Sequence, residues 1–124
     1  METSNKLLHI RVLLVCTFVL AVLFISSCSK SNDPTANEVF IKNMAFSPAT
    51  LTVTAGTTVN WTNQDGVSHT VTSDTGAFDS GTVSANGVFS HTFATAGTYN
   101  YHCTFHASMT GKVIVNASTS TTGY

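Results

Sequence analysis

Charged residues are scarce in this chain. They make up 9% of its 124 residues, whereas an ordinary soluble domain carries about a quarter. Five Lys and Arg against six Asp and Glu leave a formal net charge of -1. Proteins that bind nucleic acid neutralise many phosphates with Lys and Arg, so this composition excludes a nucleic-acid partner. The length fits a single domain with one core and excludes the two-domain architecture of many enzymes.

Phosphate-binding loops and internal repeats are also absent from the sequence. The eight glycines never form a G-x-G-x-x-G pattern after an expected strand. Between Gly56 and Gly111 they recur about once every ten residues, which is typical of strands joined by turns and leaves no room for a long helix. Hydrophobic residues nevertheless make up 43% of the chain. This content supports a packed core and excludes disorder of the whole chain.

The first residues of the chain show the pattern of an export signal. Basic residues precede an apolar run over residues 12–25, which ends in Ile25-Ser26-Ser27-Cys28. This run is too short to span a bilayer comfortably, and its end resembles a bacterial lipobox. We therefore expect residues 1–27 to be a lipoprotein signal peptide and Cys28 to carry the lipid that anchors the mature protein to a membrane. The alternative is an uncleaved anchor helix at the N-terminus.

Polar stretches without periodicity flank the body of the chain. Residues 28–37 start with the expected lipidated cysteine and continue as SKSNDPTAN, which is typical of a flexible tether. Residues 117–124 are equally polar and are expected to form a flexible tail. Residues 38–116, between these two stretches, are expected to fold as one domain.

Alternation of apolar and other residues predicts a β-structure for this domain. Pairs such as Val59 and Trp61, or Tyr101 and Cys103, lie two residues apart and so share one face of a strand. We expect an all-β fold, an antiparallel Greek-key β-sandwich of about seven or eight strands. The expected strands cover residues 38–44, 50–54, 57–62, 69–73, 77–82, 88–93, 98–103 and 111–116.

Cys103 is the expected domain's single thiol, because Cys16 lies in the signal and Cys28 carries the lipid. No internal disulfide can form, and a lone thiol beside histidines in an oxidising compartment points to metal ligation. His106 and Met109 follow Cys103 at intervals of three residues. C-x2-H alone would also fit chance or a zinc site, but the added methionine makes the pattern specific. A thiolate, an imidazole and a thioether together favour copper over hard cations.

A second histidine is needed to complete such a copper centre, and His69 is the best candidate. It follows a turn and begins an expected strand, so it can lie at the same end of the sandwich as the segment with Cys103. His102 is adjacent to Cys103 and therefore points to the opposite face of its strand. His91 lies in mid-strand and fits a core or sheet-edge histidine, but it stays open as an alternative ligand.

The segment YNYHCTFHASMTGKVIV resembles the copper loop of small blue-copper proteins, the cupredoxins. Its C-x2-H-x2-M spacing is most similar to the amicyanin type within the plastocyanin-like group. The preceding FSPATLTVTAGTTVNWTNQDGVSHTVTS also resembles that family, so the likeness covers about residues 38–115. It implies one copper ion in a type 1 site. His69, Cys103 and His106 would be the equatorial ligands and Met109 the axial ligand.

Two residues depart from the family pattern. Phe105 stands where the family usually has proline, which removes a ring that fixes the loop backbone and adds an apolar side chain. Thr70 follows His69 where the family often has asparagine, whose side chain ties the two ligand loops together. A threonine hydroxyl can make the same tie over a shorter reach. The first departure bears on the reduction potential and the docking surface, and the second on the rigidity of the ligand loops.

The expected site has no open coordination position for a substrate, which argues against an enzyme. We therefore expect a one-electron carrier of the bacterial cell envelope, with its domain in the periplasm or on the cell surface. Its partners would be redox proteins such as a cytochrome, a reductase or an oxidase. The alternatives are a lipoprotein that binds and delivers copper without carrying electrons and, less in keeping with the loop motif, a metal-free immunoglobulin-like adhesion module.

The resemblance also implies a route for the electron. In the cupredoxin family the ring edge of the second histidine, here His106, reaches the surface through an apolar patch. Phe105 and Ala107 are expected to contribute to that patch. Phe46 and Met44 are the other candidates, but we expect both to pack in the core.

Overall fold

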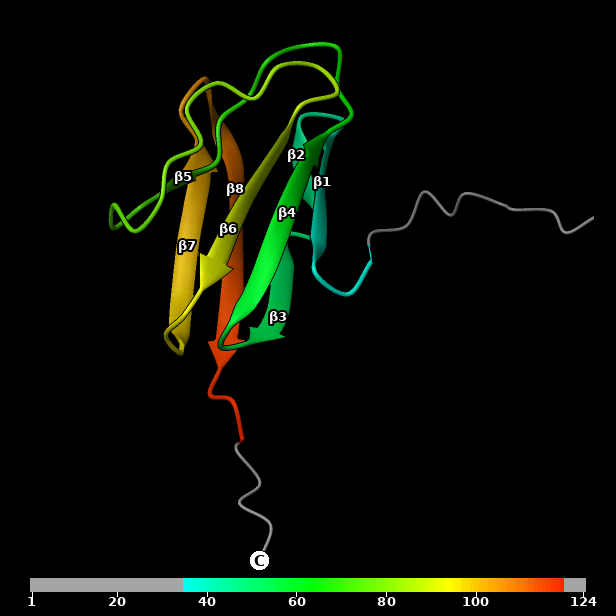
Figure 1. Cartoon of the computed structure of the whole chain (residues 1–124). Helices are drawn as coiled ribbons and strands as arrows, with labels where there is room; N and C mark the ends of the chain where they lie inside the picture. Colours follow the sequence, from blue (N-terminus) through cyan, green and yellow to red (C-terminus); the bar gives the residue numbers. More distant parts are fainter. Residues whose placement is uncertain (1–34, 120–124) are drawn as a thin grey trace, which may run out of the picture. The chain divides into compact units, whose positions relative to one another are not determined.

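The computed structural model describes residues 35–119. They form two four-stranded sheets packed as a sandwich (Figure 1). The strands are β1 (Glu38–Lys42), β2 (Ala45–Ser47), β3 (Thr50–Thr54), β4 (Thr57–Asn63), β5 (Thr72–Ser73), β6 (Val88–Phe93), β7 (Gly97–Cys103) and β8 (His106–Asn116). Over these residues no helix is long and apolar enough to cross a membrane. The expected signal peptide, the expected lipidation site Cys28 and residues 120–124 lie outside the described residues.

The strand order is β2-β1-β4-β6 in one sheet and β3-β8-β7-β5 in the other. This confirms the expected β-sandwich, but the sheets are mixed and not purely antiparallel. β1 runs parallel to β4, and β3 runs parallel to β8. The chain changes sheet at every connection except the β1–β2 and β7–β8 hairpins. Because the chain crosses between the sheets, strands that run in the same direction become neighbours in one sheet. The alternation of apolar residues shows which face of a strand a residue occupies, but not the direction of the neighbouring strand.

Three of the expected strands are divided, shortened or missing in the structure. The expected strand 38–44 is a hairpin of β1 and β2, because Asn43 and Met44 adopt φ angles of 55° and 58° and reverse the chain. The expected strand 69–73 is reduced to β5 and an isolated bridge between His69 and Val83. Residues 77–82 form no strand and pair only through the bridge between Asp79 and Thr72.

The last strand is longer than expected and starts before the predicted loop ends. β8 begins at His106 and not after Gly111, so only Thr104 and Phe105 separate it from β7. The pairing register shifts between His102 and Cys103, since His102 pairs with Thr110 whereas Cys103 pairs with His106. Residues 107–109 are therefore left without a partner on β7 and form a bulge in β8. This bulge lies where the sequence predicted a loop.

The aromatic core lies between the sheets, with Trp61 fully buried near its centre. The rings of Phe78, Phe89 and Tyr101 have centroids 5.8, 5.6 and 5.6 Å from the Trp61 ring. Burial raises the pKa of Tyr101 to about 12. Tyr101 also lies against its partner Gly111 on β8, where an added Cβ would come within 2.5 Å of the tyrosine ring. The absence of a side chain at Gly111 therefore leaves room for the tyrosine ring.

Candidate metal centre

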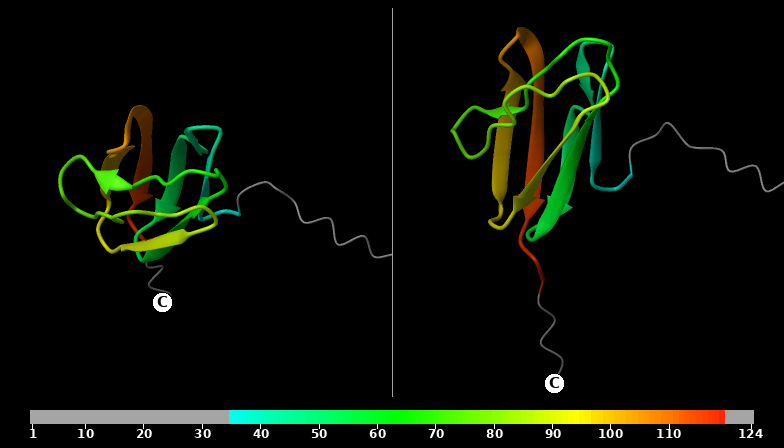
Figure 2. Two further views of the ribbon diagram at one scale, coloured as in Figure 1. Left: turned by 90° about the horizontal axis from the view of Figure 1, so that it is seen from above. Right: turned by 45° about the horizontal axis from the view of Figure 1, so that its top comes forward.

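The predicted ligands come from separate segments that meet at one end of the sandwich. His69 lies in the long connection after β4, where its backbone N–H and C=O pair with those of Val83. Cys103 ends β7, and His106 begins β8 directly after the turn. Figure 2 shows the connection between β4 and β6 passing over the end of the sheets where the β7–β8 turn also lies. The fold therefore gathers residues that are more than thirty positions apart in the sequence.

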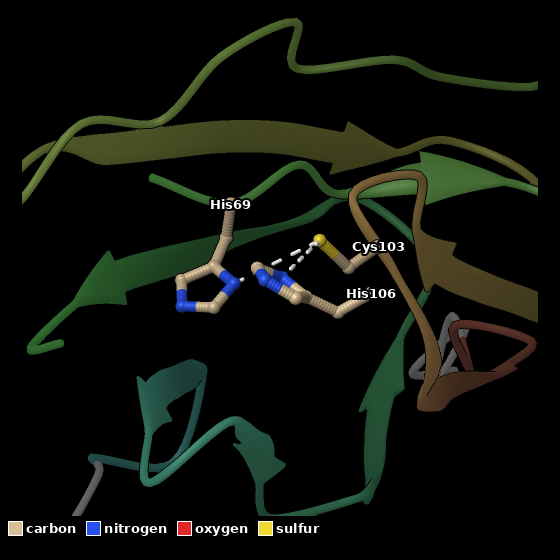
Figure 3. Close-up of side chains that lie close together, drawn as sticks. All are labelled: His69, Cys103 and His106. Carbon is tan, nitrogen blue, oxygen red and sulfur yellow. Dashed lines mark hydrogen bonds between the residues drawn. The ribbon is translucent and has the colours of Figure 1, made fainter. Parts of the chain in front are cut away.

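Three ligand atoms, one each from His69, Cys103 and His106, lie within 4.8 Å of one another. The Cys103 Sγ atom is 3.7 Å from the Nδ1 atom of His69 and 3.7 Å from the Nδ1 atom of His106. Figure 3 shows both imidazole rings on the same side of the sulfur. His69 and Cys103 are fully buried, and His106 is half-buried. A cluster of this kind is compact enough for one ion to touch all three residues.

The donor set fits copper. A thiolate with two imidazoles suits a soft or borderline metal ion, and a nearby thioether adds a weak fourth donor. The Nε2 atom of His69 faces the Asp65 carboxylate at 3.0 Å, so the ring nitrogen that faces Cys103 can be the free Nδ1. Water is excluded from the thiol by burial. The residues present therefore match the type 1 copper centre implied by the sequence.

Met109 and Phe105 are the two other residues that the sequence singled out in the segment from Cys103 to Gly111. Met109 is 2% exposed and packs with the core cluster on the inward face of β8. It is thus buried at the ligand end, three residues after His106. Phe105 sits at the tip of the β7–β8 turn and is 53% exposed, in agreement with the expected surface position.

Thr70 ties the two ligand segments together, as anticipated for this position. Its backbone N–H donates to the Cys103 Sγ atom at 3.3 Å. Its hydroxyl oxygen accepts the backbone N–H of Thr104 at 2.8 Å and lies 3.1 Å from the Thr104 hydroxyl. A threonine therefore makes the link for which the family often uses asparagine. The hydrogen bond to sulfur also stabilises negative charge on the thiolate.

Asp65 is a residue of the site that the sequence reasoning missed. Its carboxylate accepts hydrogen bonds from the backbone N–H groups of Asn43 and Met44 and faces the His69 ring. Partial burial acts to raise the pKa of Asp65, but the N–H groups of Met44 and Asn43 and the His69 ring outweigh it, so this pKa lies below its ordinary value. The available signal was its place four residues before His69, in the turn that leads to the ligand.

The other two described histidines are outside the cluster. His102 lies on the opposite face of β7, as expected, and its Nδ1 atom is 2.6 Å from the exposed Asp74 carboxylate. His91 packs against the rings of Phe78 and Phe93, whose centroids each lie 4.8 Å from its own. It lies on the edge strand β6, and burial lowers its pKa. The structure thus assigns neither histidine to the centre.

Known proteins resemble this chain over the same region. A family model described as a cupredoxin-like domain matches residues 15–115. Amicyanin from Paracoccus denitrificans is 37% identical over 82 residues, which cover 62% of this chain and 63% of that protein. Chloroplastic plastocyanin from Tetradesmus obliquus is 38% identical over 86 residues, covering 58% of this chain and 59% of that protein. The chain thus spans about three fifths of the length of these relatives.

Solved structures show the same likeness in three dimensions. An oxidized amicyanin variant superposes with a TM-score of 0.61 at 36% identity and covers 64% of this chain and 80% of its own. A purple cupredoxin from Nitrosopumilus maritimus gives a TM-score of 0.59 at 32% identity, covering 64% of this chain and 98% of its own. The family model spans more than half of the sequence, and the fold and the ligand cluster agree with it. The chain therefore belongs to the cupredoxin-like family.

Proposed function

We propose that this chain is a one-electron carrier that holds one copper ion through His69, Cys103, His106 and Met109. The observation that carries the proposal is the cluster in which two Nδ1 atoms lie 3.7 Å from one buried thiol. Copper bound there would supply a one-electron couple between Cu(I) and Cu(II). Reversible voltammetry of the copper-loaded protein tests this function.

The residues around the cluster favour electron transfer over metal exchange. Thr70 holds the thiol and the β7–β8 turn in one position through its N–H and its hydroxyl. His69 is held on both sides, by Val83 through its backbone and by Asp65 through its ring. A site whose ligands are fixed needs little rearrangement when its charge changes. Complete burial of His69 and Cys103 also shields these donors from a competing acceptor of the metal.

His106 is the proposed point of entry and exit for the electron, since it is the one half-buried member of the cluster. Among the described residues, the exposed large hydrophobic side chains all belong to segments at the same end of the sandwich. Three of them lie near the end of β4, because β1 runs parallel to β4 and the start of β6 pairs with the end of β4, and the fourth lies in the β7–β8 turn. These residues are Met44, Val67, Val88 and Phe105.

This apolar surface supports docking of a redox protein of the cell envelope, such as a cytochrome, a reductase or an oxidase. Apolar contact would orient the partner, because the whole chain is too weakly charged for strong electrostatic steering. Phe105 and Ala107 are exposed here as expected, and Phe46 is buried as expected. Met44 was expected in the core, but it is 45% exposed because the β1–β2 hairpin turns the chain at this residue.

We propose that a lipid on Cys28 anchors the protein to a bacterial membrane. The support is the lipobox-like end of the apolar run, Ile25-Ser26-Ser27-Cys28. Replacing Cys28 by serine should leave an uncleaved precursor that no longer incorporates a fatty-acid probe, because lipid transfer needs the thiol. Metabolic labelling followed by electrophoresis measures both effects. Normal processing of the variant would instead indicate an ordinary signal peptide and a protein released into the periplasm.

Substitution of Met109 tests its proposed axial role. A thioether donates weakly to Cu(II) and favours Cu(I), so Met109 should set the reduction potential more than it sets binding. Met109→Gln is expected to keep copper and lower the potential, because an amide oxygen favours Cu(II). Met109→Leu is expected to raise the potential, because loss of the axial donor costs Cu(II) more than Cu(I). Voltammetry and electron paramagnetic resonance spectra of both variants give the measurement.

The two Met109 variants control each other, since leucine and glutamine have similar volumes but opposite expected effects. Opposite shifts from the wild-type potential would support axial coordination. If Met109→Leu leaves both the potential and the spectrum unchanged, Met109 is a core-packing residue and the axial assignment is wrong. Its burial with the core cluster would then be its whole role.

A further inference from the structure

The Asp65 carboxylate links the β1–β2 turn to a candidate metal ligand. Its Oδ1 atom accepts the backbone N–H of Asn43 at 2.7 Å, and its Oδ2 atom accepts that of Met44 at 3.0 Å. The same Oδ2 atom lies 3.0 Å from the His69 Nε2 atom. One carboxylate thus faces two N–H groups of the β1–β2 turn and a ring nitrogen of a candidate metal ligand.

The β1–β2 turn depends on this carboxylate. Asn43 and Met44 are its two central residues, with φ angles of 55° and 58°. Such angles are uncommon for residues other than glycine, and methionine lacks the local hydrogen bonding that lets asparagine adopt them. Both N–H groups of the turn point to the Asp65 side chain. The carboxylate therefore offsets the strain of the turn while the turn fixes the carboxylate.

A buried amide holds Asp65 from its other side. The Asn63 side chain is fully buried at the end of β4. Its Oδ1 atom accepts the backbone N–H of Asp65 at 3.0 Å. Its Nδ2 group donates to the carbonyl oxygens of Val67 and Val83 at 2.8 and 3.0 Å. Val83 is also the backbone partner of His69, so the network returns to the ligand and keeps Asp65 and His69 at a fixed distance.

We propose that Asp65 is the positioning residue of the metal centre. It holds His69 in the tautomer with the proton on Nε2, which leaves Nδ1 facing Cys103, and its negative charge favours the more highly charged metal ion. The exposed β1–β2 turn with Met44, part of the proposed docking surface, supports the carboxylate and is thereby linked to the ligand. The effect on copper rests on the proposed function, whereas the effect on the tautomer does not.

Substitution of Asp65 by asparagine removes the charge and nearly preserves the shape. An amide has one acceptor oxygen where the carboxylate has two, so three N–H groups would compete for it. Loss of such a hydrogen bond to a ligating histidine typically costs about 10–100-fold in metal affinity. We expect the affinity for Cu(II) to fall more than the affinity for Cu(I), so the reduction potential should rise. Each tenfold difference corresponds to about 59 mV for a one-electron couple.

Two further variants provide the controls. Asp65→Glu keeps the charge on a longer side chain and should restore the potential at least in part. Asp74→Asn removes an equivalent hydrogen-bonded carboxylate from His102, which points away from the cluster. It should leave both the potential and the Cu(II) affinity unchanged. If Asp74→Asn raised the reduction potential as much as Asp65→Asn does, the inference would be overturned. The same holds if Asp65→Asn had the reduction potential and the Cu(II) affinity of the wild type.

The tautomer of His69 gives a test that needs no metal. Nitrogen-15 NMR of the metal-free, reduced protein, at a pH where the ring is neutral, should show the His69 proton on Nε2. In Asp65→Asn the Nδ1-protonated form should appear. A wild-type ring protonated on Nδ1 would overturn the inference whether or not the variant folds, and so would an unchanged ring in a folded Asp65→Asn protein. Both results hold even if the wild type fails to cycle copper. Failure of the wild type to show a copper couple would count against the proposed function alone.

Discussion

Replacement of Cys103 by serine is expected to abolish the blue colour of the copper-loaded protein while the sandwich stays folded. The colour of such a centre requires a thiolate bound to Cu(II), and Cys103 is the thiol of the cluster. Serine occupies nearly the same volume, and its hydroxyl oxygen can accept the Thr70 N–H that now donates to sulfur. Absorption spectra after addition of Cu(II), together with thermal unfolding of the metal-free protein, measure the two parts of this result.

The matching control is Cys28→Ser, which removes a thiol by the same exchange outside the domain. It should leave the colour intact in the purified protein. If the colour survives in Cys103→Ser, Cys103 is not a ligand and the proposed centre is wrong. If both colour and fold are lost, the thiol also matters for packing, because it is fully buried in the core cluster.

Substitution of Gly111 by alanine is expected to destabilise the domain strongly. The added Cβ would lie 2.5 Å from the Tyr101 Cζ and hydroxyl oxygen atoms and 2.8 Å from Cε2. The tyrosine ring is rigid, 1% exposed and packed edge-on against Trp61 and Phe46, so moving it aside would disturb the aromatic core. Overpacking of this kind typically lowers the free energy of unfolding by about 1–3 kcal/mol. Denaturant unfolding of the metal-free protein gives the measurement.

Gly66→Ala is the control for this change. Gly66 lies in the connection after β4, an added Cβ would have no atom within 4 Å, and its φ angle is not in the left-handed region. Its free energy of unfolding should stay within about 0.5 kcal/mol of the wild type. Equal stability of the two variants would show that the Tyr101 ring can move aside, against the packing described here. Because Tyr101 lies two residues before Cys103, Gly111→Ala should also broaden the spectrum of the copper centre.

Local patterns predicted much of the fold and of the candidate site. Alternation places Tyr101 and Cys103 on the buried face of β7 and His102 on the other, as the structure confirms. The spacing of Cys103 and His106 places two donors on one turn, and the structure brings His69 to them. The link through Thr70 was expected from the resemblance to the cupredoxins, in which an asparagine at this position often ties the ligand loops together.

Features set by contacts distant in the sequence were not predicted. The direction of β1 relative to β4 depends on crossings between sheets, which alternation does not record. The turn at Asn43 and Met44 has no glycine to mark it and is stabilised by Asp65, over twenty residues away. The early start of β8 at His106 follows from a bulge opposite His102 and Cys103. Each of these three features depends on contacts that exist only once the sandwich has formed.

Voltammetry of the protein loaded with one copper ion tests the central proposal most directly. We predict a reversible one-electron couple in which the oxidised form is blue, the reduced form is colourless, and copper stays bound through repeated cycles in the presence of a chelator. The buried, hydrogen-bonded positions of His69 and Cys103 are the reason for this expectation. Release of copper to the chelator on reduction, or absence of any couple in the copper-loaded protein, would contradict the assignment as an electron carrier.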